Sequence, residues 1–508
     1  MKHNTAVVLL ALASLLLAGA TNSLAQVMHR LTLDQSLAIG LNRSQQAKQL
    51  EQSLLNSRMS LKAAEASFKS FGELVFSSLP NLRQGISQTQ IGTGEFVFPR
   101  QNFVDMQAEL FVNQPLAMTD GVISLVGVMQ RFHQSITTSI DVGGTPFEQR
   151  TSSTTYLPQL RLQFRQPLFT LNRLKTNYRK ADLNLENTLQ TYSRSQLDII
   201  YNVTSAFYNL FRLQQQLAID QAQAQQSENA FHLARLKQQA GLFPELEVLR
   251  LEVEMANARN TLANSRANLQ RTEDSFKLLI GLPMEDSVRV VTELTYRPIQ
   301  VVLERALAEA LQRRTELRSD EIAVQLSEIS VAETDAASEI TGELYASYGL
   351  LNEEKKFRDA FQKFDTDRSV KLALSVPLWD WGKNGAEVQA ARAALQSDRL
   401  TQQNRTEAIK QEIRDAVRNL ESAQQRLEIT RRSEELAEKS YRISLLKFES
   451  GDLSSQDLAL EQNRLTQART NSLNAIIDYK QALADLRRKT LWDFELEAPV
   501  QVTAPPAR

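Results

Sequence analysis

Two long runs without glycine or proline constrain this chain more than any other feature of its sequence. One lies between Pro167 and Gly241 and the other between Gly385 and Gly451, and both are rich in residues that favour helices. A helix rises 1.5 Å per residue, so each run can form a rod of roughly 100 Å. Because a helix in a globular protein averages three or four turns, rods of this length indicate a protein that spans a distance.

Both runs lie in a duplicated unit, which four landmarks reveal. Pro167 and Gly241 recur as Pro377 and Gly451, 210 positions later. Two earlier landmarks recur 270 positions later, namely Leu41-Asn42-Arg43 as Leu311-Gln312-Arg313 and Gly72-Glu73-Leu74 as Gly342-Glu343-Leu344. The two offsets imply one insertion of about 60 residues in the first copy. We therefore divide the chain into a leader (1–25), a first repeat (26–300) with its insertion at about 79–155, a second repeat (301–491) and a C-terminal tail (492–508).

Each repeat is predicted to hold three helices and a short strand region. The first helix covers roughly Thr32 to Ser70 in one copy and Val301 to Ile340 in the other. After the strands comes the long rod, which ends at a glycine, and a return helix follows over Glu245–Ile280 or Leu453–Leu491. A glycine between two long helices is a typical helix-ending signal, and apolar residues recur at spacings of three and four. Each rod and its return helix therefore predict an antiparallel coiled-coil hairpin.

Two stretches between the helices alternate with the period of a strand. Leu160, Leu162 and Phe164 alternate with polar residues, and Val370–Val376 alternates in the same way. Both stretches end at a repeated proline, which cannot donate to an interior ladder. The expected partner strands are Glu73–Ser78 and Glu343–Leu350, which gives two strands per repeat. Such strands suit a membrane barrel and a half-buried soluble sheet equally well.

The N-terminus has the pattern of a cleaved secretory signal. Lys2 precedes an apolar stretch from Ala6 to Ala18, and Ser23-Leu24-Ala25 supplies small residues for cleavage, so we expect the mature chain to start near Gln26. No later segment approaches 18 consecutive apolar residues, which argues against a helical membrane span. An exported protein with a few alternating strands can still be integral to an outer membrane.

Composition and motifs give no sign of catalysis. Cysteine is absent, which excludes disulfides, thiolate metal sites and a lipid anchor on cysteine. Lys plus Arg number 58 and Asp plus Glu 59, so the charge balance does not favour nucleic acid. The four histidines lie without ligand spacing, and the chain has no nucleophile elbow, phosphate loop or dinucleotide motif. We therefore predict a protein that is not an enzyme and that uses no metal or cofactor.

From about Leu31 to Leu491 the chain resembles the TolC-type outer-membrane channels of tripartite efflux pumps and type I secretion systems. The duplication, the segment Pro377-Leu378-Trp379-Asp380-Trp381-Gly382 and the turn Phe448-Glu449-Ser450-Gly451-Asp452-Leu453 carry the resemblance. It implies a mainly α fold with a small β part. Three subunits with four strands each would close a 12-stranded outer-membrane barrel, continued through the periplasm by a helical barrel of coiled-coil hairpins.

Two features depart from the family pattern. The first copy has Phe169-Thr170-Leu171-Asn172 where the second has Trp379-Asp380-Trp381-Gly382, so its strand-to-helix corner is expected to differ. The insertion at Leu79–Thr155 contains the alternating Met106, Ala108, Leu110 and Val112, followed by a second candidate strand end at Gln114-Pro115-Leu116. The choice of membrane strand within it stays open, and an enlarged external loop or plug-like hairpin is expected.

The resemblance also implies roles for individual residues. The hairpin tips would dock a periplasmic adaptor through Leu236, Gly241, Leu242, Leu445, Gly451 and Leu453, although ordinary hairpin packing explains the four leucines equally well. A periplasmic gate would lie six and nine positions after the turn glycine, at Asp457 and at Leu460, where the family has a carboxylate. Glu461 and, in the first copy, Glu247 are the neighbouring candidates. The strand-to-helix corners would be formed by Pro167, Pro377, Trp379 and Gly382.

The leading interpretation is a passive, homotrimeric exit duct in the outer membrane. A periplasmic adaptor and an inner-membrane transporter would open it and supply the energy, since the chain has no nucleotide site. Asp457 has a simpler interpretation as a solvated residue whose charge suits a helix N-terminus. The alternatives for the whole chain are a periplasmic coiled-coil adaptor or scaffold without a pore, and a secreted enzyme with helical decoration.

Overall fold

The structure is a computed structural model that describes residues 28–90, 96–142, 145–293, 296–337 and 339–500. The chain divides into two units, which we describe separately. The helical unit contains Met1–Leu54, Thr188–Ser319 and Gln402–Arg508, and the sheet unit contains Leu55–Asn187 and Asp320–Thr401. The expected signal peptide (1–25) lies outside the described residues.

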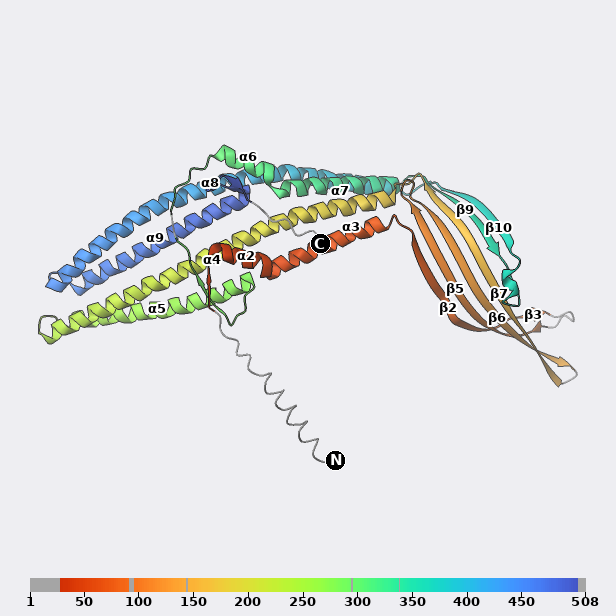
Figure 1. Cartoon of the computed structure of the whole chain (residues 1–508), viewed down its shortest axis with the longest axis horizontal. Helices are drawn as coiled ribbons and strands as arrows, with labels where there is room; N and C mark the ends of the chain where they lie inside the picture. Colours follow the sequence, from red (N-terminus) through yellow and green to blue (C-terminus); the bar gives the residue numbers. More distant parts are fainter. Residues whose placement is uncertain (1–27, 91–95, 143–144, 294–295, 338, 501–508) are drawn as a thin grey trace, which may run out of the picture. The chain divides into compact units, whose positions relative to one another are not determined.

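The two predicted rods are present as the longest helices of the chain's described part. α4 (Arg173–Gln239) has 67 residues and α8 (Lys383–Ser450) has 68, so each is about 100 Å long. The return helices are α5 (Glu245–Ile280) and α9 (Ser455–Thr490). In Figure 1 α5 lies beside α4 and α9 beside α8, which confirms the two antiparallel hairpins.

The first helix of each repeat was predicted as one element, and this expectation is wrong in both copies. The structure has α2 (Leu33–Arg43) and α3 (Gln45–Ala66) in the first copy, and α6 (Leu303–Arg313) and α7 (Thr315–Ala337) in the second. The breaks fall at Ser44 and Arg314, which have extended backbone angles. The Ser44 hydroxyl accepts a hydrogen bond from the Ala47 N–H at 3.1 Å and so caps α3. The Arg314 guanidinium bonds Glu412 at 2.7 Å and the Lys489 carbonyl at 2.9 Å, which ties the second break to α8 and α9.

The helical unit has one large core where the helices meet two short strands. β1 (Met28–Leu31) pairs in parallel with β8 (Ser287–Val290). Their apolar side chains join those of α2, α4, α5, α6, α8 and α9 in a single cluster. At its centre Phe207 and Tyr479 are fully buried, and the Tyr479 hydroxyl donates to the Arg297 carbonyl at 2.8 Å. A small pair, β11 (Trp492–Asp493) and β12 (Ala498–Pro499), closes the described chain.

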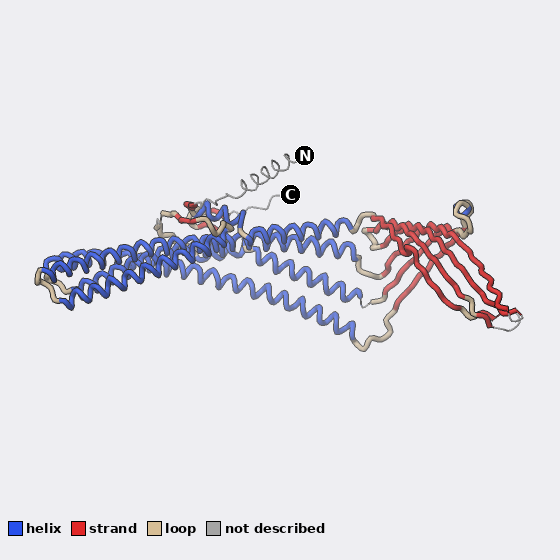
Figure 2. Tube along the Cα trace, turned by 90° about the horizontal axis from the view of Figure 1, so that it is seen from below, coloured by secondary structure: helices blue, strands red, loops and turns tan. Residues whose placement is uncertain are grey.

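The sheet unit contains one antiparallel sheet, whose strands are red in Figure 2. The strand order is β10-β9-β7-β6-β5-β2. Its strands are β2 (Phe71–Ile86), β5 (Arg100–Leu116), β6 (Gly121–Val142), β7 (Thr145–Leu168), β9 (Thr341–Leu351) and β10 (Asp365–Ser375). Three of the four predicted strands lie within β2, β7 and β9, and the fourth, Val370–Val376, extends one residue beyond the end of β10. The expectation of four strands per chain is nevertheless wrong, because the inserted segment contributes β5 and β6 to the same sheet.

Two small features join the strands away from the helices. β3 (Thr89–Gln90) and β4 (Phe96–Val97) pair in the connection between β2 and β5. A short 3₁₀ turn, η1 (Asp359–Phe361), lies in the connection between β9 and β10. Among the described residues, no helix combines the length and apolar character that a membrane crossing requires.

Candidate functional site

The two hairpin turns are built in the same way, around a glycine with a positive φ. Gly241 has φ 73° and Gly451 has φ 92°. The Leu242 N–H donates to the Lys237 carbonyl, and the Asp452 N–H to the Lys447 carbonyl, both at 2.9 Å. This is the Schellman arrangement, which satisfies the last carbonyls of a helix and favours glycine. The predicted turn positions are therefore correct in geometry.

A second apolar cluster joins the two hairpins near their turns. It contains Ala230, Ala234, Val248, Leu251, Phe448 and Leu458. Lys237 reaches across from α4 and donates to the carbonyls of Phe448 at 2.7 Å and Glu449 at 3.2 Å. Its ammonium also lies 5.1 Å from the centre of the Phe448 ring. Lys237 thus satisfies the C-terminal carbonyls of α8, a role that nothing in the sequence distinguishes from that of other lysines.

The four leucines expected at the hairpin tips fall into two groups. Leu236 is 64% exposed and Leu242 is 75% exposed, so both present apolar surface at the first turn. Leu445 and Leu453 instead pack against the cluster that joins the hairpins. Leu446, which sequence reasoning missed, is exposed beside the second turn.

Glu247 connects the two hairpins directly. Its carboxylate accepts hydrogen bonds from the backbone N–H of Ser455 at 3.2 Å and from the Ser455 hydroxyl, and it pairs with Arg250 at 3.1 Å. Ser455 is buried at the first residue of α9. Glu247 therefore ties the start of α5 to the start of α9.

Asp457 and Leu460 lie together in a surface groove near the turns. The groove is lined from α5 by Arg250, Val253 and Glu254, among others. The Ser454 hydroxyl donates to the Asp457 carboxylate at 2.7 Å and accepts from the Asp457 N–H at 3.1 Å, so Asp457 takes part in the N-terminal cap of α9. Asp457 remains exposed, and Leu460 is 48% exposed.

Glu461 points instead toward α8. It accepts hydrogen bonds from the Ser440 hydroxyl at 2.6 Å and from Arg464 at 2.5 Å. The bond from Ser440, followed by the bond and charge of Arg464, lowers the pKa of the Glu461 carboxyl. Of the four gate candidates, Asp457 and Leu460 thus face open surface, whereas Glu247 and Glu461 hold helices together.

The second strand-to-helix corner is organised by Asp380. Its carboxylate accepts from the N–H groups of Gly382 at 2.9 Å and Asn384 at 2.8 Å, and these two bonds lower the pKa of Asp380. Gly382 has φ 84°, which favours glycine, and Trp381 shares the left-handed region at φ 57°. Trp379 is 77% exposed and Trp381 is 96% exposed. Pro377 lies just beyond β10, which ends at Ser375.

The first corner is built differently, as its sequence predicts. Asn172 caps α4 by accepting from the Lys175 N–H at 2.9 Å. Asp120, in the turn between β5 and β6, accepts from the Leu174 N–H at 3.2 Å, and the Asn172 amide donates to the Ala117 carbonyl at 2.9 Å. The turn of the inserted hairpin therefore helps to hold the start of α4.

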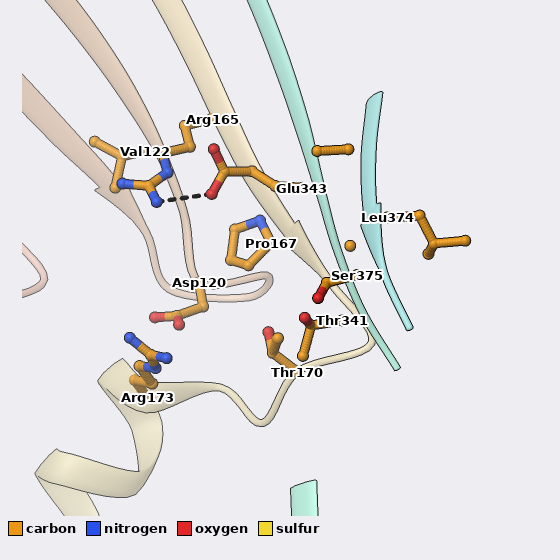
Figure 3. Close-up of a pocket in the computed structure, with 12 residues that line it drawn as sticks. Asp120, Val122, Arg165, Pro167, Thr170, Arg173, Thr341, Glu343, Leu374 and Ser375 are labelled. Carbon is orange, nitrogen blue, oxygen red and sulfur yellow. Dashed lines mark hydrogen bonds and ion pairs between the residues drawn. The ribbon is translucent and has the colours of Figure 1, made fainter. Parts of the chain in front are cut away.

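A pocket opens beside this corner, and Figure 3 shows its lining. Pro167 borders it at the end of β7, with Asp120 and Arg173 below and Ser375 from β10 on the other side. The guanidinium of Arg165 and the carboxylate of Glu343 are joined at 2.7 Å across β7 and β9. The described residues contain no group of three or more His, Cys, Asp or Glu side chains arranged to hold a metal ion.

The six strands share one apolar face, and their other face, called the polar face below, carries most of the charged residues of β5 and β7. In the pairing register, Leu110 lies opposite both Leu74 and Gly127, and Leu160 lies opposite both Gly127 and Leu350. Since alternate residues face the same side, one side of the sheet carries apolar side chains from all six strands, whereas the other side carries charged and amide side chains together with Phe111, Val126 and Val128. Its exposed members are Leu74, Phe76, Met106, Leu110, Val112, Ile123, Leu125, Leu160, Leu162, Tyr348, Val370, Leu372 and Leu374. Exposed apolar surface of this extent indicates a site of contact with lipid or with another protein chain.

Comparison of the sequence with protein families identifies the family. The profile of the outer membrane efflux protein family matches residues 135–282 and 306–490, more than half of the chain. Nodulation protein T of Rhizobium leguminosarum bv. trifolii is 22% identical over 321 residues, which cover 61% of this chain and 67% of that protein.

Solved outer-membrane channels have the same fold. OprN superposes with a TM-score of 0.65 at 16% identity, covering 90% of this chain and 89% of that one. The CmeC channel of Campylobacter jejuni gives 0.67 at 12% identity, covering 90% and 85%. The open-state MtrE channel of Neisseria gonorrhoeae gives 0.63 at 14% identity, covering 92% and 91%. With its duplicated hairpins and its two-faced sheet, the chain belongs to the outer membrane efflux protein family.

Proposed function

We propose that three copies of this chain form a passive exit duct in the outer membrane, for an efflux pump or a type I secretion system. The observation that carries the proposal is the antiparallel sheet, whose exposed apolar face is joined to helices of 67 and 68 residues. An apolar outer face and a polar inner face are what a barrel wall in lipid requires. Proteins of this family are outer-membrane channels and not enzymes.

Aromatic side chains at the strand ends support a position in the membrane. Phe71, Phe169, Trp379 and Trp381 are exposed at the ends nearest the helices. At the other ends, Phe96, Phe98, Phe147 and Phe357 are exposed. Girdles of aromatic residues at both water–lipid boundaries are typical of outer-membrane barrels. A periplasmic scaffold without a pore would not require a sheet with exposed aromatic residues at both ends of its strands.

Exposed apolar stripes on the helices support self-association. Ile429, Leu436 and Ile443 repeat every seven residues along α8, and all three are exposed. Leu246, Leu249 and Val253 form a second exposed stripe on α5. A heptad of apolar residues marks the seam between neighbouring helices of a coiled coil. We infer that these stripes pack between protomers of the homotrimer, in its periplasmic part.

The turns and the groove fit the periplasmic end of the duct. Leu236 and Leu242 at the first turn, and Leu446 at the second, offer apolar contacts for a periplasmic adaptor, which would connect the duct to an inner-membrane transporter. Asp457 and Leu460 supply a charge and an apolar group for the gate. Glu247 holds the two hairpins of each chain together and so would resist their separation on opening.

Extraction in mild detergent, followed by electrophoresis and planar-bilayer recording, tests the proposal. We expect a trimer that dissociates only on heating, and stable single-channel conductance after reconstitution. A water-soluble monomer or dimer without conductance would instead support the scaffold.

A further inference from the structure

The inserted hairpin, β5 and β6, is continuous with the rest of the sheet. β5 pairs with β2 on one side and with β6 on the other, and β6 pairs with β7 from Val122 to Val142. The hairpin therefore separates β2 from β7, two strands that would otherwise be neighbours. Its turn, residues 117–120, lies at the helix end of the sheet, where Asp120 bonds the first turn of α4.

The hairpin shares the two faces of its neighbours. Leu110 on β5 is 49% exposed, close to the 50% of Leu162 on β7, and both lie on the apolar face. On the polar face Asp105 accepts from Ser78 of β2 at 3.4 Å and from Gln130 of β6 at 2.9 Å. The hydroxyl of Ser124 donates to Asn113 at 2.5 Å. A hairpin folded outside the wall as a loop or plug would not need an apolar face in register with that of the wall.

The edges of the sheet permit closure with a second copy. Among the described residues, β2 and β10 are the outermost strands of the sheet, and each pairs with one neighbouring strand. β2 leaves the end of α3 and runs away from the helices, whereas β10 runs toward the start of α8. β10 of one protomer and β2 of the next therefore lie antiparallel in a ring, and insertion of two strands leaves this direction unchanged.

We propose that the trimer closes a barrel of eighteen strands, six from each chain, with β5 and β6 as part of its wall. This inference rests on the trimeric channel proposed above. Barrel diameter grows roughly linearly with strand number, so at equal tilt this barrel is about 1.5 times as wide as one of twelve strands. The outer exit then admits hydrophilic solutes of greater cross-section, such as polymers, than a twelve-stranded exit does.

Single cysteines test whether the hairpin forms part of the wall, in a chain that has no cysteine of its own. We would place them at Leu110 and Asn113 on β5, with Leu162 and Gln163 on β7 as matched references. In the reconstituted trimer, a charged, membrane-impermeant maleimide should label Asn113→Cys and Gln163→Cys. Leu110→Cys and Leu162→Cys should resist this reagent, and a fluorophore on them should be quenched by brominated lipid. The proposal would be overturned if the reagent labels both Leu110→Cys and Asn113→Cys while the two β7 variants behave as expected. The hairpin would then lie in water.

Polymer exclusion tests the width. Polyethylene glycols small enough to enter the wild-type channel should reduce its conductance, and the largest polymer radius that does so is the limiting radius. A variant with β5 and β6 replaced by a short Gly-Ser linker should have a limiting radius smaller by about a third. An unchanged limit in a trimeric, conducting deletion variant would refute the wider barrel while leaving the channel function intact. Absence of conductance in the wild type would instead refute the channel itself. If the deletion variant does not assemble, the cysteine labelling decides.

Discussion

At the scale of single residues, a few side chains fix the ends of the long helices. Gly241 and Gly451 allow the turns, Lys237 caps α8 from the neighbouring hairpin, and Asp380 and Asn172 start α8 and α4. These contacts are local, and their effects can be measured one residue at a time.

Replacement of both turn glycines by valine should impair docking of the adaptor. A β-branched residue at positive φ costs roughly 1–2 kcal/mol per turn, and an added Cβ meets no other atom within 4 Å at either position, so the effect comes from the backbone. Co-purification of pump components should fall in Gly241→Val/Gly451→Val. The Asn variants are the matched control, because asparagine tolerates this conformation, and they should assemble nearly normally. Normal assembly of the valine variant would remove the turns from the docking site.

Asp457→Asn should reduce cation selectivity, and Leu460→Ser should raise the leak of the closed channel. Three Asp457 carboxylates around a threefold axis would repel by about 0.7 kcal/mol per pair at roughly 6 Å in a water-like dielectric, and they would attract cations. Leu460 would supply an apolar constriction that resists wetting. Single-channel recording measures both effects. If selectivity and leak are unchanged in both variants, Asp457 is only a helix-capping residue.

The bond network of Glu461 predicts a dependence of stability on pH. The pKa of Glu461 is lowered in the folded protein, so its stabilising contribution is present above the ordinary carboxylate pKa of about 4.3. This contribution is lost as the pH falls through the lowered value. Glu461→Gln should therefore lower the heat-dissociation temperature of the trimer at neutral pH, and the difference from wild type should shrink in acid. A difference that is constant from pH 7 to pH 3 would show that the charge of Glu461 contributes nothing.

At the scale of elements, the sequence predicts the helices better than the sheet. The rods follow from the absence of glycine and proline, and the hairpins from Gly241 and Gly451, because these signals are local. The break at Arg314 carries no such signal, since Arg314 is held by Glu412 and Lys489, which are distant in the sequence. The break at Ser44 does have a local signal, a serine that caps α3, which the prediction of a single helix passed over. Glu247 and Glu461 stay predictions for the gate. The bond that each of them makes to a neighbouring helix is likewise a contact between distant segments, which the sequence does not reveal.

The inserted hairpin shows a similar limit. Its alternation from Met106 to Val112 is visible in the sequence and fits a strand. The pairing of β5 with β2 and of β6 with β7 depends on contacts between distant segments, which alternation does not specify. The alternation predicts two strands per repeat and the family resemblance implies four per chain, whereas the sheet of this chain has six.

At the scale of the whole molecule, we expect assembly to depend on apolar surface that a single chain leaves exposed. Leu436→Asp/Ile443→Asp should weaken the trimer, because each substitution places a charge in a seam that association would bury, at a cost of several kcal/mol per protomer. Arg442→Asp, on another side of α8, is the matched control and should leave the trimer intact. Sedimentation in detergent compares the two. Equal trimer content in all variants would place the seam elsewhere.

The connection of the inserted hairpin has a consequence for how this architecture can vary. Strand β2 ends and strand β7 begins at the same end of the sheet, the end away from the helices, and β5 and β6 lie between them in the sequence. Whole hairpins can therefore be gained or lost there in evolution without changing where any helix begins. In the proposed duct, mutation can therefore change the width of the exit separately from the periplasmic helices. We expect pumps that share periplasmic partners to differ in the size of the solutes they release.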